Sequence, residues 1–172
     1  MASKNVQDML NQSQAVEEEN IGVVRRFFEA ASTGDTSKAH EFIAPDWVSA
    51  DSKANPRLAK LRGPELFIEA IRMLHSAFAD LHYEEEDIVA SRDRVVAVVS
   101  VKGRHVGENA GIPATGRSFS TSVVEMFKIV NGKVVEQRAF RDRLRFLIQV
   151  GVLGPSSPEY EHAFEILKDS LR

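Results

Sequence analysis

Apolar residues in the first half of the chain recur at the spacing of helices. A first helix is predicted to begin after the acidic run 17–19, because acidic side chains suit the positive end of a helix dipole, and to end at Gly34. Its apolar face comprises Ile21, Val24, Phe28 and Ala31. A short second helix is predicted over 36–43. The segment 45–56, which contains Trp47, is predicted to be a loop.

A third helix is predicted from the most regular amphipathic stretch of the chain. It opens at Gly63-Pro64-Glu65, since proline is well tolerated in the first turn of a helix. Its apolar residues, at helical spacing, are Phe67, Ala70, Ile71, Leu74 and Phe78.

From residue 81 onward the apolar pattern changes to that of strands. The predicted strands cover 81–91, 94–107, 117–130 and 133–142. Asn131-Gly132 joins the last two as a type I′ turn, because both central positions of that turn need positive φ. The run from Val95 to Val99 is apolar on both faces, so this strand must be covered on both sides. A partner subunit is a candidate for one of the two covers.

The two ends of the chain are predicted to lie outside the main domain. Residues 1–16 are polar and without a clear period, which predicts a loosely docked arm. The main domain spans 17–153 and closes with a short apolar helix or turn that ends at Gly151. Residues 154–172 predict a linker followed by an amphipathic helix that Ser157 caps.

Helices followed by a run of antiparallel strands are typical of an α+β domain. We expect a cone-shaped α+β barrel, in which a strongly bent antiparallel sheet wraps around the N-terminal helices, with an extra C-terminal helix. Such a cone encloses one internal cavity. A small-molecule site is expected there.

Composition narrows the classes of function. The 172 residues include no cysteine, and the five histidines show no metal-ligand spacing, so no metal or organic cofactor is expected. A net charge of −3 without a basic stripe argues against nucleic acid as a partner. The polar N-terminal segment lacks the apolar stretch of a secretory signal, and the apolar runs are too short to span a membrane. A cytoplasmic protein is therefore expected.

Two ionisable residues on the predicted strands are candidates for chemistry. Asp142 ends the last strand between the apolar residues Phe140 and Leu144, an environment that raises the proton affinity of a carboxyl group and suits acid/base work. The alternative role for Asp142 is a helix N-cap. His105 continues one face of its strand, where it could polarise a carbonyl or serve as a structural histidine. Arg138 shares strand parity with Phe140 and Asp142, and a surface-facing position is favoured for it.

Short segments in a fixed order resemble a known family. They are Val23 to Ala30, Gly34-Asp35, Ala44-Pro45-Asp46-Trp47, Gly63-Pro64-Glu65, Ala77 to Leu81, Gly103-Arg104-His105, Gly111 to Arg117, Asn131 to Glu136 and Leu147 to Gly151. Together they resemble the SnoaL-like polyketide cyclases of the nuclear transport factor 2-like superfamily. The resemblance implies a small cone-shaped enzyme that closes rings in aromatic polyketides by intramolecular aldol condensation, without a cofactor.

Residue by residue, the resemblance places the family's acid/base aspartate on Asp142 and its neighbouring histidine on His105. Trp47, Phe119 and Phe140 are expected to contribute to the substrate-binding wall. Arg138 stands where the family often has tryptophan, and it is a further candidate for substrate contact.

Two other functions fit the same fold. One is a hydrolase or isomerase in which Arg138 and Asp142 position a water molecule. The other is a non-catalytic module for small-molecule binding or assembly. In each case a hydrophobic small molecule is the expected ligand, and a homodimer or homotetramer through the exposed face of the sheet is the expected assembly.

Overall fold

The computed structural model describes residues 2–49, 52 and 55–154, with side chains from residue 7 onward. Its helices are α1 (Ala2–Thr33), α2 (Ala39–Phe42), α3 (Gly63–Ala77) and α4 (Arg143–Gln149). Its strands are β1 (Ile43–Ser49), β2 (Phe78–Ser91), β3 (Arg94–His105), β4 (Ser118–Val130) and β5 (Lys133–Arg141). The C-terminal helix that the sequence predicts lies outside the described residues.

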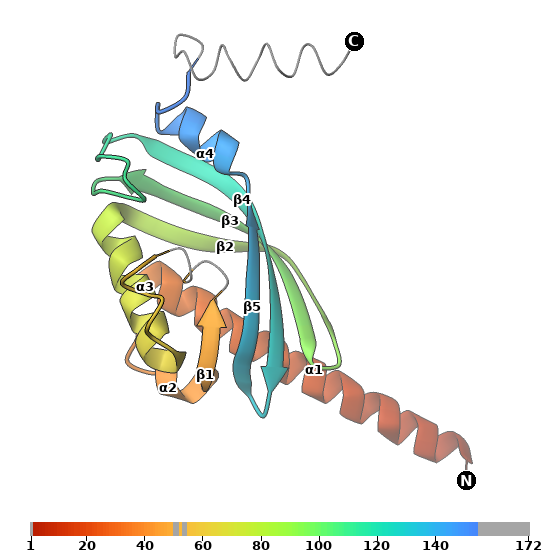
Figure 1. The fold of residues 1–172 in the computed structure, drawn as a ribbon. Helices are drawn as coiled ribbons and strands as arrows, with labels where there is room; N and C mark the ends of the chain where they lie inside the picture. Colours follow the sequence, from red (N-terminus) through yellow and green to blue (C-terminus); the bar gives the residue numbers. More distant parts are fainter. Residues whose placement is uncertain (1, 50–51, 53–54, 155–172) are drawn as a thin grey trace, which may run out of the picture.

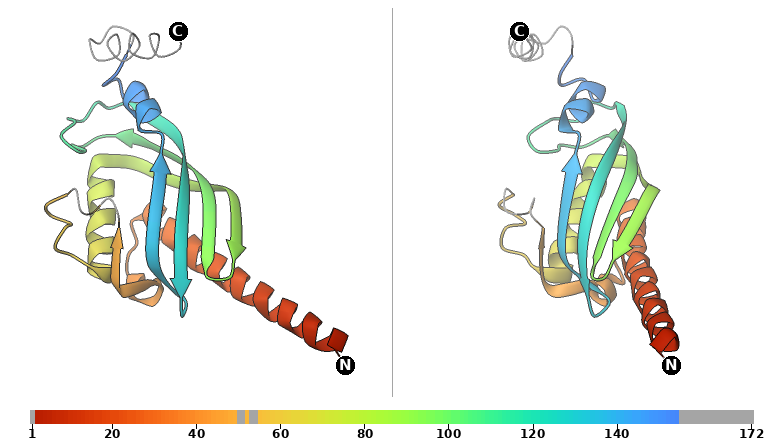
Figure 2. Two further views of the ribbon diagram at one scale, coloured as in Figure 1. Left: turned by 45° about the vertical axis from the view of Figure 1, so that its right-hand side comes forward. Right: turned by 90° about the vertical axis from the view of Figure 1, so that its right-hand side faces the viewer.

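The strands form one curved, unclosed sheet in the order β1-β5-β4-β3-β2. Neighbouring strands from β2 to β5 are antiparallel, and β1 is parallel to β5. Figure 1 and Figure 2 show the sheet bending around α1, with α3 beside β1 and α4 at the far end of β4 and β5. The prediction of a bent sheet wrapped around N-terminal helices is confirmed.

Strand β1 corrects the prediction of a loop over 45–56. The segment from Ile43 pairs with β5, first through Val134 and then, after an irregularity, through Glu136 and Gln137. Pro45 lies within that irregularity and cannot donate a ladder hydrogen bond. Proline is tolerated there because β1 is an edge strand. The sequence prediction was wrong because a proline weakens the strand signal of such a short segment.

Helix α1 begins well before the predicted start after residue 19. It runs without a break from Ala2 to Thr33, and the side chains of 7–16 are exposed on a segment that projects past the sheet (Figure 2). Residues 1–16 contain neither glycine nor proline. Extending a helix that is already packed costs much less than starting one, so the polar segment continues the helix.

Local turn chemistry agrees closely with the sequence. Asn131 and Gly132 have φ of 51° and 71°, as the type I′ turn requires. Gly63 starts α3 with φ of 60°, and a Cβ added there would lie 2.3 Å from the carbonyl oxygen of Pro45. The close approach of α3 to β1 therefore requires glycine at this position.

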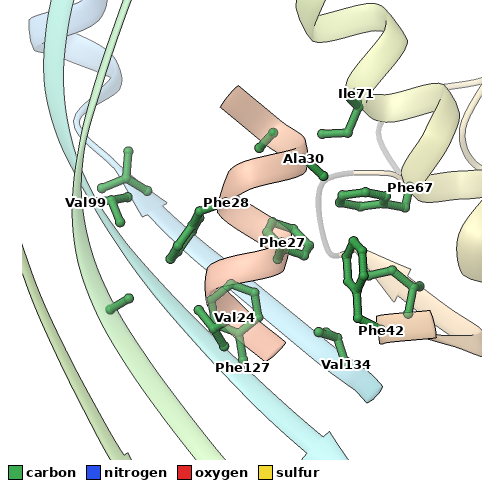
Figure 3. Close-up of a cluster of buried hydrophobic side chains, with 14 of the residues drawn as sticks. Val24, Phe27, Phe28, Ala30, Phe42, Phe67, Ile71, Val99, Phe127 and Val134 are labelled. Atoms are coloured by element: carbon green, nitrogen blue, oxygen red, sulfur yellow. The ribbon is translucent and has the colours of Figure 1, made fainter. Parts of the chain in front are cut away.

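Aromatic side chains from α1 fill the space between the sheet and α3 (Figure 3). The ring of Phe27 lies 4.9 Å from that of Phe67 on α3 and 5.1 Å from that of Phe127 on β4, measured between centroids. Phe28 contacts Phe127 as well, at 5.7 Å. The core thus joins α1, α3 and the concave face of the sheet into one unit.

Candidate functional site

Asp142 lies at the exposed end of β5 and caps α4. Its carboxylate accepts a hydrogen bond from the backbone N–H of Arg145 at 2.8 Å. Phe140 and Leu144, which the sequence predicts to shield it, are 59% and 52% exposed. The prediction that these two side chains shield Asp142 from water is therefore wrong, because both are themselves exposed to solvent. The geometry at Asp142 is that of a helix cap.

Arg138 and Phe140 lie on the outer face of the sheet. They pair across the strands with Met126 and Val124, whose side chains are also exposed. The shared parity of Arg138 and Phe140 is as predicted. Because alternate side chains of a strand point to opposite faces, it is Gln137 on β5 that points to the buried interior.

His105 and Phe119 come together at the other end of the interior. His105 is fully buried, and its Nδ1 lies 3.2 Å from the hydroxyl oxygen of Thr115. Its ring packs against Phe78, and Phe119 and Phe146 complete an aromatic cluster with centroid separations of 5.1 to 6.3 Å. Within the described residues, Nε2 of His105 has no hydrogen-bond partner.

Trp47 belongs to the core beside β5. Its ring lies 6.5 Å from Phe27 and 6.2 Å from Phe67, and the residue is 2% exposed. The indole Nε1 finds no hydrogen-bond partner in the part of the chain that the structure describes. Trp47 thus lines the interior and anchors β1 at once.

A buried polar cluster occupies the concave face of the sheet, and two of its residues, Glu125 and Gln137, were not predicted from the sequence. Glu125 on β4 is 2% exposed, and its Oε2 accepts a hydrogen bond from the amide Nε2 of Gln137 at 2.7 Å. Tyr83 on β2 faces the same interior. Burial raises the pKa of the Tyr83 hydroxyl, the negative charge of Glu125 raises it further, and Arg141 partly opposes the rise.

A signal for this cluster exists in the sequence. Glu125 shares strand parity with Val123 and Phe127, so it is a charged residue on an otherwise apolar strand face.

Two hollows on the surface lie away from this cluster. One, of about 330 Å³, is lined by α3 and the end of α1 around His75 and Gly34. The other, of about 600 Å³, lies between the projecting part of α1 and the turns that hold Arg92 and Asn131. Among the described residues, no group of three or more histidine, aspartate or glutamate side chains is arranged to hold a metal ion. No helix in the same part of the chain is long and apolar enough to cross a membrane.

The curved sheet packed on α1, with ionisable side chains facing its interior, is the architecture of the small α+β cone proteins. Within that class, residues 22–150 match the family model of the SnoaL-like polyketide cyclases, and the chain belongs to this family. The resemblance found in the sequence is confirmed.

Three of the similar proteins are from Streptomyces. Aklanonic acid methyl ester cyclase DnrD of Streptomyces peucetius is 38% identical over 138 residues, which cover 79% of this chain and 93% of DnrD. Aklanonic acid methyl ester cyclase DauD of Streptomyces sp. strain C5 is also 38% identical, over 79% of this chain and 84% of DauD. The solved structure of TsrD from Streptomyces laurentii superposes with a TM-score of 0.70 at 31% identity, covering 79% of this chain and 97% of TsrD.

Proposed function

We propose that this protein closes a ring in an aromatic polyketide, by intramolecular aldol-type addition within aklanonic acid methyl ester or a close chemical relative. The observation that carries the proposal is the similarity to two aklanonic acid methyl ester cyclases, each 38% identical over 138 residues. The match covers 93% and 84% of their own lengths, so it extends over nearly the whole of each cyclase.

An aldol-type ring closure makes three demands on a protein. One group must take a proton from the carbon next to a carbonyl, a donor must stabilise the oxygen that gains charge, and apolar walls must hold the aromatic rings. The proposal is supported by the aromatic side chains that face the interior of the curved sheet, Phe119 among them. No electrons or groups pass to a second molecule, so the reaction consumes no co-substrate, and we propose that it proceeds without a metal or an organic cofactor.

Among the residues predicted from the sequence, His105 keeps its proposed role of orienting or polarising a substrate oxygen. Its burial and its unpartnered Nε2 support that role. Trp47 and Phe119 are proposed as wall residues. The predicted substrate contacts of Arg138 and Phe140 have no support from their place on the outer face.

For Asp142, we propose capping of α4 as the main role, with proton transfer as the alternative. The hydrogen bond from Arg145 supports the cap. The exposure of Phe140 and Leu144 removes the apolar surroundings, one of the two grounds for the predicted catalytic role, and leaves the family resemblance as the other.

The reaction is tested with purified protein and aklanonic acid methyl ester, with and without EDTA. We expect conversion to an isomer of unchanged mass and new retention time in liquid chromatography–mass spectrometry, equally fast in EDTA. Heat-denatured protein controls for spontaneous closure. Recovery of the ester unchanged would contradict the proposed reaction. A stoichiometric metal whose removal abolishes conversion would contradict cofactor independence.

We also propose that copies of the protein associate through the outer face of the sheet, as a homodimer or homotetramer. Exposed apolar residues on β2, β4 and β5 support this proposal: Val89, Val124, Met126 and Phe140. The cytoplasmic location stays a prediction.

A further inference from the structure

Glu125, the charged residue of the interior polar cluster, lies on the middle of β4 at the concave face. Glu125 is in register with Ala97 on β3 and with Ala139 on β5. Both neighbours in this row carry only a methyl group. On its own strand, Glu125 stands between the buried residues Val123 and Phe127. The carboxyl group therefore projects toward the interior between the smallest side chains of its row.

A carboxyl group in such a place is costly to the fold. Removing an ionised carboxylate from water is unfavourable unless hydrogen bonds and nearby charge compensate it, and an apolar residue of similar size is often as stable. Gln137 supplies one hydrogen bond, which holds Oε2 of the carboxylate at 2.7 Å. A buried ionisable group that is held by a specific partner is a candidate for proton transfer.

Tyr83 approaches the same space from β2. Its ring stacks on Phe28 of α1, with centroids 5.9 Å apart and an angle of 17° between the planes. Phe28 in turn contacts Phe127, two residues from Glu125 on β4, and Figure 3 shows both rings between α1 and the sheet. The negative charge of Glu125 acts on the Tyr83 hydroxyl, and with burial it raises the pKa of that hydroxyl. The hydroxyl thus stays protonated at neutral pH and is available as a hydrogen-bond donor.

We propose that Glu125 transfers the proton and that Tyr83 donates a hydrogen bond to the substrate oxygen in this interior. The proposal rests on the ring-closing function proposed above. The Glu125 carboxylate takes a proton from the carbon next to a carbonyl, and the electron pair of the broken C–H bond moves to that carbonyl oxygen. Tyr83 stabilises the resulting enolate.

The enolate carbon then attacks a second carbonyl of the same molecule, so that one C–C bond forms and the second carbonyl oxygen becomes an alkoxide. The proton on Glu125 returns to the alkoxide. The product is an isomer of the substrate, and no other reactant is needed. Gln137, which holds the carboxylate, is a positioning residue. His105 keeps its separate role at the far end of β3.

The first test replaces Glu125 with glutamine, which preserves size and hydrogen bonding but removes proton transfer. With aklanonic acid methyl ester as substrate, Glu125→Gln is expected to lower kcat by ~10²–10⁴-fold. Its melting temperature and its Kd for the ester, measured by fluorescence quenching, are expected to stay close to those of the wild type. Glu136→Gln is the matched control, because Glu136 is an exposed glutamate on the same sheet that pairs with Arg94. It is expected to leave kcat unchanged.

Two further variants test the roles of the neighbours. Tyr83→Phe removes only a hydroxyl group and is expected to lower kcat by about 10²-fold, the usual loss for one oxyanion donor. Gln137→Met is expected to lower kcat while leaving KM unchanged, which a general loosening of the fold would not do. If Glu125→Gln does not fold, the kcat values of Tyr83→Phe and Glu125→Asp test the proposal instead. Glu125→Asp keeps a carboxyl group at this position.

A second readout separates this inference from the proposed function. In D₂O the wild type is expected to exchange the proton next to the carbonyl of the ester for deuterium, and Glu125→Gln is expected to lose this exchange. A wild type that closes the ring while Glu125→Gln remains equally active overturns the inference alone. A wild type that neither exchanges nor converts the ester contradicts the proposed function, and the inference falls with it.

Discussion

Two carboxylates on neighbouring strands have very different surroundings. Glu125 on β4 is 2% exposed and bonded to the amide of Gln137, whereas Asp142 follows β5 and bonds to the backbone of Arg145. A capping carboxylate acts on the helix and is best left in water. A carboxyl group held in an apolar interior can act on a substrate that is bound there. The roles of Glu125 and Asp142 are therefore tested with different substitutions.

For Asp142, replacement by asparagine distinguishes the cap from the catalyst. Asparagine caps helices as well as aspartate does, so Asp142→Asn is expected to leave both the melting temperature and the rate of ring closure close to the wild type. Asp142→Ala, which removes the cap, is expected to cost about 1 kcal/mol of stability. Thermal melts measure the stability of the two variants, and the conversion assay measures their rate of ring closure. A large loss of activity in Asp142→Asn at an unchanged melting temperature would return Asp142 to the mechanism.

At the scale of elements, α1 covers the concave face and is tied to β2 and to the turn after it. The guanidinium of Arg25 donates two hydrogen bonds to the carboxylate of Glu85, at 3.0 and 2.8 Å. At the β2–β3 turn, Arg92 donates its backbone N–H to Glu17 and accepts a hydrogen bond from the amide of Asn20. These contacts orient the helix that closes the interior.

The Arg25–Glu85 pair predicts a pH-dependent contribution to stability. Its hydrogen bonds and charge hold the pKa of Glu85 below its usual value. The ionised form therefore stabilises the folded state above the ordinary glutamate pKa, and this contribution is lost as the pH falls through the lowered value. Because Arg25 is largely exposed, the pair is worth about 1 kcal/mol or less.

Melting temperatures of the wild type and Glu85→Gln measure this contribution. The wild type is expected to be the more stable at pH 7, and the difference is expected to shrink at acidic pH. Glu86→Gln is the control, because it removes one negative charge at the neighbouring position. A difference that is constant with pH would exclude ionisation of Glu85 as its source.

At the scale of the whole molecule, the sheet has one covered face and one open face. Helix α1 packs on the concave face, and Figure 2 shows the opposite face free of helices of the described chain. Val124 lies opposite Phe140, and Met126 lies between Val96 and Arg138 in the adjacent strands. The exposed apolar side chains are thus neighbours across the sheet, as expected of an association surface.

A charge placed on this face should prevent association. Phe140 is 59% exposed, and Phe140→Glu is expected to yield a monomer near 19.1 kDa in analytical ultracentrifugation at micromolar concentration, where the wild type is expected to be a dimer or larger. Leu10→Glu is the control, since Leu10 is 54% exposed on the projecting part of α1. A wild type that sediments only as a monomer would contradict the proposed assembly.

Much of the fold could be predicted from the sequence because its signals are local. The proline in the first turn of α3 and the Asn131-Gly132 turn each act on the backbone of the nearest residues. Helix α4 before Gly151 was predicted in the same way. The family could also be recognised from the sequence, because the family's short segments and their order can be read directly from the chain.

Only the tertiary structure decided what each side chain meets. Trp47 is in a strand because β1 pairs with β5, more than 80 residues away in the chain. Phe140 points outward and Gln137 inward because β5 has one face on α1, which strand parity alone leaves undetermined. Glu125 acquires its environment from β2, β3 and β5 together. Burial and charge are set by contacts between distant segments. The sequence alone therefore determined the family and most elements, whereas the packing of the sheet decided the place of β1 and which carboxylate faces the interior.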